Sequence, residues 1–390
     1  MTVNIIASPT TWIEGEAVRQ LEAVAKWNGM LKCVGLPDLH PGKGSPIGAA
    51  FLSTIIFPTL VGPDIGCGMN LWSTSLSSKK PKIEQIAKKL NGLDDPWNGD
   101  LDEWLCKRNQ NLITKYDESL GTPGFGNHFI EIQAIDTIFD ESYGFSSDVL
   151  YVMVHSGSRG FGKSILDEYA SFNGAAGVTA DSHEGARYLV KHTFAMEWAV
   201  ANRDLCAHRV LESLDATGTR LLDICHNSVT ESIEDGCSCW LHRKGAAPSD
   251  KGLIVIPGSR GDLSYVVSPI QSDTALNSLA HGAGRKLSRT EAQGKLSEIY
   301  KKKDIHKNKW GGRVVCGNKQ LLWEEAAECY KNITSVITDL VDAGLINIVA
   351  TLHPLVTFKT SEGVEEELEN NRKDWQKNRK DARNMKERNR

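Results

Sequence analysis

The sequence predicts an α+β fold. Stretches with helical periodicity and extended apolar runs follow one another irregularly, without the regular βαβ alternation of a doubly wound sheet. No internal repeat of roughly 20 to 50 residues is visible, which excludes solenoids and propellers. The chain has 390 residues, of which 40% are apolar, and is therefore long enough to bury a large core.

Apolar periodicity indicates where the individual elements lie. Residues 14–27 repeat apolar side chains at spacings of three, as an amphipathic helix does. Further helices are predicted at residues 79–90, 183–206 and 323–340. Extended runs predict strands at residues 148–154, 253–257, 264–267 and 347–359. The turn-rich residues 91–126 are expected to form a variable surface excursion.

Composition restricts the class of protein. No run of about 18 apolar residues is present, so we expect no transmembrane helix and no membrane association. Residues 1–12 lack the basic-then-apolar plan of a signal peptide, which predicts a cytoplasmic protein with reduced cysteines. The net charge of −4, taken alone, argues against a nucleic-acid-binding protein.

The charge is unevenly distributed along the chain. Residues 372–390 contain nine basic and three acidic residues, a net charge of +6, so the preceding residues carry −10. We expect residues 361–390 to form a charged C-terminal tail, either helical or disordered. This tail either keeps the protein soluble or acts as an electrostatic arm for RNA or an acidic partner.

One segment matches the phosphate-binding loop of P-loop NTPases. The sequence from Gly157 to Ser164 is GSRGFGKS, after an expected strand and before a helix-like run. In such a loop Lys163 would reach the terminal phosphates and Ser164 would ligate magnesium. A P-loop NTPase is therefore one alternative, although it leaves the histidine clusters elsewhere in the chain unexplained.

Those clusters suggest a metal centre. Asp64 and Cys67 lie three residues apart in a tight glycine turn. Three histidines lie beside small or polar residues at expected ends of elements: His128, His155 and His226. One carboxylate, one thiolate and three imidazoles could hold two divalent cations, with the thiolate as a bridge. Ligand softness alone favours zinc or iron, and a paired-metal site suits phosphoryl transfer.

His281 has the surroundings of a nucleophile or of an ordinary loop histidine. Gly282, Ala283 and Gly284 follow it and leave room for a phosphate or ribose near the backbone. Arg285 could neutralise an α-phosphate. A neutral imidazole beside a metal-held triphosphate could attack phosphorus and form a phosphoramidate.

Glu131 and Lys359 together suggest which nucleotide base the site would select. A carboxylate accepts hydrogen bonds from N1–H and N2–H of guanine, and an ammonium group donates to O6, so the pair would reject adenine. Nothing in the sequence itself brings these two residues together.

Eight ordered motifs resemble the signature of RtcB-type RNA ligases. Between about residues 33 and 360 they read LPDLHPGKGSPIG, VGPDIGCGMN, GNHFIEIQ, VHSGSRGFG, CHNSV, HRKGA, IPGSRGDLSYVV and AHGAGRKLSR. The resemblance implies an RtcB-type fold, with mixed β-sheets in a central core flanked by helices. It also implies a single catalytic domain at residues 1–360.

The activity that this resemblance implies is joining of broken RNA. With GTP and two Mn²⁺ ions, a histidine is guanylylated and passes GMP to an RNA 3′-phosphate, made first from a 2′,3′-cyclic phosphate where necessary. A 5′-hydroxyl then displaces GMP from the RNA-3′-pp-G intermediate. Implied substrates are tRNA halves or cleaved rRNA, with an activating protein or a delivery adaptor as a further partner. A non-catalytic RNA-end-binding protein is the alternative, against which the complete set of ligands argues.

Motif by motif, the resemblance makes His281 the guanylylated nucleophile and Cys67 the bridging ligand. The implied metal ligands are Asp64, Cys67, His128, His155 and His226. The implied guanylate-binding residues are Asn127, His128, Phe129, Ile130, Glu131, His226, Asn227, Pro257, Gly258, Ser259, Arg260, Ser264, His281, Gly282, Ala283, Gly284 and Lys359. Lys163 then has no assigned role, and Arg159 becomes a candidate phosphate contact.

The chain departs from the family pattern in three places. Arg260 replaces the methionine of the usual PGSMG turn and adds a charge beside the nucleotide pocket. Lys359 is followed by Thr360 and further residues, where the family commonly ends in Lys-Gly. Trp323 lies in the region of a family tyrosine that can stack on the base.

Overall fold

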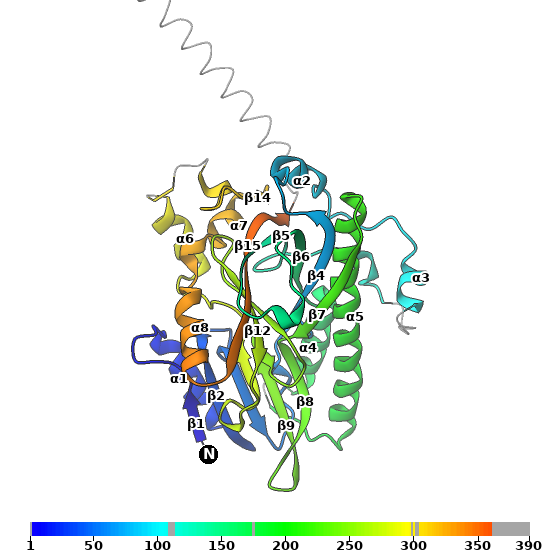
Figure 1. Ribbon diagram of the computed structural model, residues 1–390. Coiled ribbons are helices and arrows are strands. Elements are labelled where there is room, and N and C mark those ends of the chain that lie inside the picture. The colour runs from blue at the N-terminus through cyan, green and yellow to red at the C-terminus, as the bar shows by residue number, and fades with distance from the viewer. Residues whose placement is uncertain (1, 108–113, 174–175, 298, 301–303, 361–390) are drawn as a thin grey trace, which may run out of the picture.

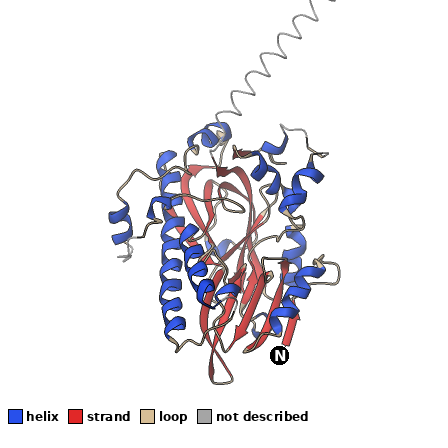
Figure 2. Cartoon of the chain, turned by 180° about the vertical axis from the view of Figure 1, so that it is seen from behind, coloured by secondary structure: helices blue, strands red, loops and turns tan. Residues whose placement is uncertain are grey.

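The computed structural model describes residues 2–107, 114–173, 176–297, 299–300 and 304–360, and the predicted tail lies outside them. Two β-sheets occupy the centre of the described chain, and helices cover them on the outside (Figure 1). Seen from behind, the strands are enclosed by helices on both sides (Figure 2). The predicted α+β class, with mixed sheets flanked by helices, is confirmed.

The larger sheet is strongly curved (Figure 1). Its strands within the described residues are β4 (Gly68–Ser77), β5 (Phe129–Ile138), β6 (Val149–Ser156), β7 (Gly218–Cys225), β11 (Ile254–Pro257), β12 (Ser264–Pro269), β14 (Arg313–Cys316) and β15 (Ile346–Thr360). They are ordered β11-β12-β15-β5-β6-β4-β7, with β14 beside β15. Neighbours are antiparallel except β14 and β15, which are parallel.

The smaller sheet continues the core below the first. Its strands are β1 (Thr2–Ile5), β2 (Met30–His40), β3 (Ile47–Ser53), β8 (Asn227–Glu234) and β9 (Cys237–Lys244), in the order β1-β2-β3-β9-β8. A short antiparallel pair, β10 (Ala246–Pro248) and β13 (Ser278–Ala280), leads into the loop that holds His281. A shared apolar cluster joins residues of both sheets, so the sheets pack as one core.

The described helices are α1 (Gly15–Ala25), α2 (Ile83–Lys89), α3 (Leu101–Cys106), α4 (Arg159–Asn173), α5 (His183–Ser213), α6 (Arg289–Leu296), α7 (Lys319–Glu324) and α8 (Ile333–Asp342). The longest is α5, whose first turn is capped by Ser182 accepting from the backbone N–H of Gly185. Its apolar face packs on the larger sheet through Ala207 and Val210. No helix of the described residues is long and apolar enough to cross a membrane.

The helix predicted at residues 323–340 is confirmed only over its C-terminal part. α7 ends at Glu324 and α8 begins at Ile333, with a separate single turn between them. Within the interruption, Lys331 N–H donates to the carbonyl of Gly284, so this segment lies beside the loop after His281. Residues 91–126 also differ from a pure surface excursion, since Leu105 and Leu120 are buried against α5.

Candidate active site

The predicted metal ligands lie at one edge of the larger sheet. Cys67 precedes β4 and His128 precedes β5. His155 lies near the end of β6, and His226 follows β7. Because β5, β6, β4 and β7 are successive antiparallel neighbours, the first residues of β4 and β5 lie at the same edge as the last residues of β6 and β7. The fold therefore gathers residues that are up to 159 positions apart.

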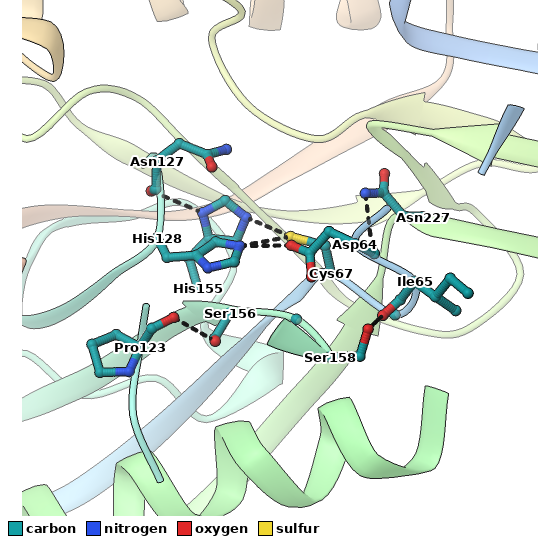
Figure 3. Close-up of polar contacts among 12 residues, drawn as sticks. Asp64, Ile65, Cys67, Pro123, Asn127, His128, His155, Ser156, Ser158 and Asn227 are labelled. Carbon is teal, nitrogen blue, oxygen red and sulfur yellow. Dashed lines mark hydrogen bonds and ion pairs between the residues drawn. The ribbon is translucent and has the colours of Figure 1, made fainter. Parts of the chain in front are cut away.

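The donor atoms of Asp64, Cys67, His128 and His155 converge (Figure 3). Cys67 Sγ lies 3.3 Å from Nε2 of His128 and 3.3 Å from Nε2 of His155. The Nε2 atoms of His155 and His226 are also 3.3 Å apart. Asp64 Oδ2 lies 2.8 Å from Nε2 of His128. The residues form two sets that share the thiol, Asp64–Cys67–His128 and Cys67–His155–His226.

Burial sets the protonation of these donors. It lowers the pKa of His155 and His226 well below the usual value, so both imidazoles are neutral. Burial and the Asp64 carboxylate raise the pKa of the Cys67 thiol well above its usual value. A divalent cation would reverse this balance by stabilising the thiolate. Burial opposes ionisation of Asp64, but contact with His128 holds its pKa below the usual value.

The donor set fits two divalent cations. Asp64 Oδ1 and His128 Nδ1 are buried polar atoms without a hydrogen-bond partner in the described chain. Imidazoles that point at a shared sulfur and a carboxylate form the mixed N, O and S environment of paired transition-metal sites. The Asn127 carbonyl lies 3.3 Å from Nδ1 of His155, which favours a proton there and leaves Nε2 free to coordinate.

A buried arginine on α5 holds this edge in place. Arg203 donates to both carboxylate oxygens of Asp223, at 2.7 and 2.9 Å. Its Nη1 also donates to the carbonyls of Gly66, at 2.7 Å, and of Ser156, at 2.9 Å. Those carbonyls belong to the residues next to Cys67 and His155. Arg203 therefore fixes the backbone on either side of the shared thiol.

His281 lies beside the predicted metal ligands. Its ring centroid is 4.7 Å from that of His226. Its Nδ1 is 2.7 Å from Oδ2 of the fully buried Asp38, at an angle outside the hydrogen-bond range. The same oxygen accepts from the backbone N–H of His281 at 3.3 Å. A carboxylate at this position favours a proton on Nδ1 and leaves the lone pair on Nε2.

A cavity of about 740 Å³ opens from His281. Twelve of the predicted guanylate-binding residues line it: Asn127, Phe129, Glu131, Pro257, Gly258, Ser259, Arg260, His281, Gly282, Ala283, Gly284 and Lys359. Gly284 has φ +72°, and a Cβ there would lie 2.2 Å from the carbonyl oxygen of Asp38. Only glycine fits this position, so the loop backbone stays open to the cavity.

Glu131 and Lys359 meet in this cavity because β5 and β15 are neighbours. Glu131 is paired with Thr357, two residues before Lys359. Thr357 Oγ1 and Gln133 Nε2 each donate to the Glu131 carboxylate at 2.6 Å. Burial raises the pKa of Glu131 to about 7. Burial also lowers the pKa of Lys359, although Glu325, 3.7 Å away, opposes this.

The other predicted guanylate-binding residues lie outside the cavity lining. The Ile130 side chain is buried in the core, because it points to the opposite face of β5 from Glu131. Ser264 is buried and accepts a hydrogen bond from Gln133 at 3.3 Å. Asn227 links two loops, donating to the Asp64 carbonyl at 3.1 Å and accepting from Gly245 N–H at 2.7 Å. His128 and His226 belong to the two donor sets that could hold metal ions.

The arginines near the site differ in their availability. Arg285 is occupied, since it donates to the carbonyl of Glu324 at 2.8 Å and pairs with Glu325 at 3.1 Å. Arg260 lines the cavity, with one nitrogen donating to the Leu322 carbonyl at 2.9 Å and Nη1 buried without a partner in the described chain. We therefore no longer expect Arg285 to bind an α-phosphate. Trp323 is absent from the described lining of the cavity.

The structure does not support the P-loop alternative. β6 ends at Ser156 and α4 begins at Arg159, so only two residues lie between strand and helix. Lys163 therefore lies within α4, where its exposed side chain pairs with Asp167 one turn away. A phosphate-cradling loop needs its backbone N–H groups free before the helix begins, and here they are already in the helix.

Sequence reasoning assigned no role to the residues that support the site. Asp38 lies in the LPDLH motif, 243 positions from His281, and only its place in a glycine-rich motif marked it. Arg203 lies within an amphipathic helix, where an arginine is usually a solvated residue. Neither contact is local in sequence.

Comparisons with known proteins agree with this geometry. The family model described as "tRNA-splicing ligase RtcB" matches residues 20–96 and 97–360. The chain is 44% identical over 368 residues to RNA-splicing ligase RtcB2 of Escherichia coli strain ATCC 25922, covering 93% of this chain and 96% of that protein. The chain belongs to the RtcB family.

Two further members of the RtcB family are less similar to the chain than RtcB2 is. The chain is 29% identical to RNA-splicing ligase RtcB of Escherichia coli K12, covering 89% of this chain and 95% of that protein. It is 28% identical to tRNA-splicing ligase RtcB of Thermococcus kodakarensis, covering 89% and 91%. The match spans both sheets and the donor cluster, and the protein is an RNA ligase.

Proposed function

We propose that this RtcB-family protein is a GTP- and Mn²⁺-dependent ligase. It joins RNA 3′-phosphate or 2′,3′-cyclic phosphate ends to 5′-hydroxyl ends through a guanylylated His281. The observation that carries the proposal is the position of His281 between two features. Its ring is 4.7 Å from that of a candidate metal ligand, and it lines a cavity of nucleotide size.

Two Mn²⁺ ions would be held by the two donor sets, with the Cys67 thiolate shared between them. When bound, they would neutralise charge on the phosphate oxygens and on the departing oxygen of a phosphoryl transfer. Thiolate and imidazole by themselves favour softer metals, so the choice of manganese rests on the family resemblance. The chain contributes convergent donors and a buried frame that keeps them in place.

His281 would act as the nucleophile through Nε2. Asp38 near Nδ1 favours the tautomer with its proton on that nitrogen, so the Nε2 lone pair is available. A P–N bond forms between Nε2 and the α-phosphorus of GTP, while the P–O bond to pyrophosphate breaks. The product is a phosphoramidate that carries GMP.

Guanine would bind at the β5–β15 wall of the cavity. The Glu131 carboxylate accepts from N1–H and N2–H of the base, and Lys359 donates to O6. Adenine has an acceptor at N1, which would face the Glu131 carboxylate, also an acceptor. Its donor amino group at C6 would face the Lys359 ammonium, also a donor. The open backbone of Gly282 and Gly284 would take the ribose and phosphate.

The RNA steps would follow at the same centre. An oxygen of the RNA 3′-phosphate attacks the GMP phosphorus, the P–N bond to His281 breaks, and RNA-3′-pp-G forms. The 5′-hydroxyl of the second strand then attacks the 3′-phosphorus, and GMP leaves as the phosphodiester closes. A 2′,3′-cyclic end is first opened by water to the 3′-phosphate. We propose tRNA halves or cleaved rRNA as substrates and a cytoplasmic setting, with an activating protein or delivery adaptor as a further partner.

A joining assay tests this proposal. Purified protein with GTP and Mn²⁺ should join a 3′-phosphate or 2′,3′-cyclic-phosphate RNA to a 5′-hydroxyl RNA. It should not join a 3′-hydroxyl RNA to a 5′-phosphate RNA. Joining only of the second pair, or joining that needs no GTP, would refute the proposed chemistry. A protein that takes up GMP but joins neither pair would be the RNA-end-binding alternative.

A further inference from the structure

We propose that Phe125 is a stacking platform for the base of the nucleotide that carries the RNA 3′-phosphate. This inference deepens the proposed ligase function and rests on it. The Phe125 side chain is 62% exposed, which leaves a large apolar ring facing solvent. Phe125 also lies three residues before His128, a candidate metal ligand, so their Cα atoms are at most about 11 Å apart.

Two glycines hold Phe125 in this position. Gly124 and Gly126 have φ +96° and +74°, left-handed conformations that side chains other than glycine rarely adopt. A Cβ on Gly124 would lie 1.4 Å from Nη1 of Arg159, and one on Gly126 would lie 3.1 Å from Nη2 of Arg289. A guanidinium group therefore packs against the backbone on each side of the exposed ring.

The two guanidinium groups belong to different parts of the site. Arg159 interacts electrostatically with Asp64 at the metal centre, and its Nε is buried without a hydrogen-bond partner in the described chain. Arg289 lines the cavity and pairs with Glu324 at 3.0 Å. Phe125 thus lies where the metal centre and the nucleotide cavity meet.

An exposed aromatic ring between cationic groups is suited to an unpaired nucleotide. Single-stranded nucleic acid is bound by rings that stack on bases and by cations that follow the phosphates. The 3′-phosphate must approach His281 to receive GMP, which would bring its base near the end of the sheet where Phe125 lies. Arg159 would contact that phosphate while the ring takes the base.

Stacking would act on RNA and not on GTP. Removal of one stacking ring should therefore raise the KM for the 3′-phosphate strand and leave kcat nearly unchanged. The expected rise for Phe125→Ala is about tenfold. Guanylylation without RNA should stay within about twofold of wild type, since no base from RNA takes part in it.

The experiment compares four variants with wild type. Phe125→Ala and Phe125→Leu remove the aromatic face, and Phe125→Trp keeps it. Phe139→Ala is a matched control, since Phe139 is 58% exposed but lies beyond the far end of β5, about 33 Å along the strand from Phe129. The 3′-phosphate strand is used with its normal terminal nucleotide and with a stable abasic 1-deoxyribose there.

Support requires that Phe125→Ala and Phe125→Leu raise KM, that Phe125→Trp and Phe139→Ala do not, and that the abasic strand removes the difference. An unchanged KM in Phe125→Ala would overturn the proposal. A difference that survives the abasic 3′ strand, and disappears only with an abasic 5′-hydroxyl strand, would overturn it too. If wild type takes up no GMP, the proposed function fails separately. Anisotropy of the 3′-phosphate strand on the same variants then still decides whether Phe125 stacks.

Discussion

Nδ1 of His281 lies 2.7 Å from Oδ2 of Asp38, although 243 positions separate the two residues in the chain. Asp38 lies on β2, and His281 lies in the loop that follows β13. In the proposed mechanism the Asp38 carboxylate favours a proton on Nδ1 and leaves the lone pair on Nε2. Of the supporting contacts, this one is the most directly linked to the proposed chemistry.

Asp38→Asn should slow guanylylation of His281 by about 10³-fold. The Asn amide oxygen can accept a hydrogen bond from Nδ1–H in only one rotamer and carries no charge, so the tautomer with its proton on Nε2 is favoured, as when the Asp of other His–Asp pairs is replaced by Asn. GMP affinity should change little. Rapid-quench measurement of label transfer from GTP gives the rate, and circular dichroism checks the fold. A rate equal to wild type would show that Asp38 does not orient the nucleophile.

Glu131 predicts a pH dependence of GMP binding. Its pKa in the free protein is about 7, and guanine needs the carboxylate form, so affinity is lost as the pH falls through 7. GMP should bind about tenfold more weakly at pH 6 than at pH 8, and Glu131→Gln should bind weakly at both. Calorimetry with GMP and AMP measures this, with Glu14→Gln at the exposed rim as control. An unaltered slope in Glu131→Gln would contradict the assignment.

Arg203→Met should destabilise the fold by about 3 to 5 kcal/mol, because Asp223 is left buried without its partner. Arg220→Met is the matched control, since its pair with Asp204 is partly exposed and should contribute less than about 1 kcal/mol. Urea unfolding of both variants measures the difference. Equal losses of unfolding free energy would mean that Arg203 does not hold this edge of the sheet in place.

His192 predicts a loss of stability in acid. Burial lowers its pKa to about 4, and its Nε2 accepts from Val229 N–H at 3.1 Å. Between pH 4 and 6.5 the unfolded chain binds more protons at this site, so stability is complete above pH 6.5 and falls as the pH drops toward 4.

His192→Gln should remove about 2 kcal/mol of the change in unfolding free energy between pH 7 and pH 5. The exposed His208 on the same helix gives the control exchange, His208→Gln. Urea midpoints at the two pH values provide the test. If both variants keep the wild-type slope, His192 does not carry this dependence.

Local patterns predicted much of the fold and of the candidate site. β6, β11, β12 and β15 lie close to their predicted positions, because apolar runs between turns are local signals. The helix predicted over residues 323–340 is interrupted between Glu324 and Ile333, where Lys331 N–H donates to the Gly284 carbonyl, a distant contact that helical periodicity does not reveal. The phosphate-loop match failed because α4 begins at Arg159, before the glycine-lysine pair.

Pairings distant in sequence could not be predicted from periodicity. Glu131 and Lys359 share a cavity wall only through the register of β5 with β15. Asp38 meets His281 only when two separate strand pairs are in place. Such contacts depend on sheet order, which no single segment encodes.

Labelling with GTP tests the central claim most directly. Wild-type protein, His281→Ala and Lys163→Ala are incubated with α-labelled GTP and Mn²⁺ and separated by denaturing electrophoresis. We predict acid-labile label on wild type and on Lys163→Ala, and none on His281→Ala. Label that persists on His281→Ala, or that disappears only from Lys163→Ala, would contradict the assignment of His281 as the guanylylated nucleophile.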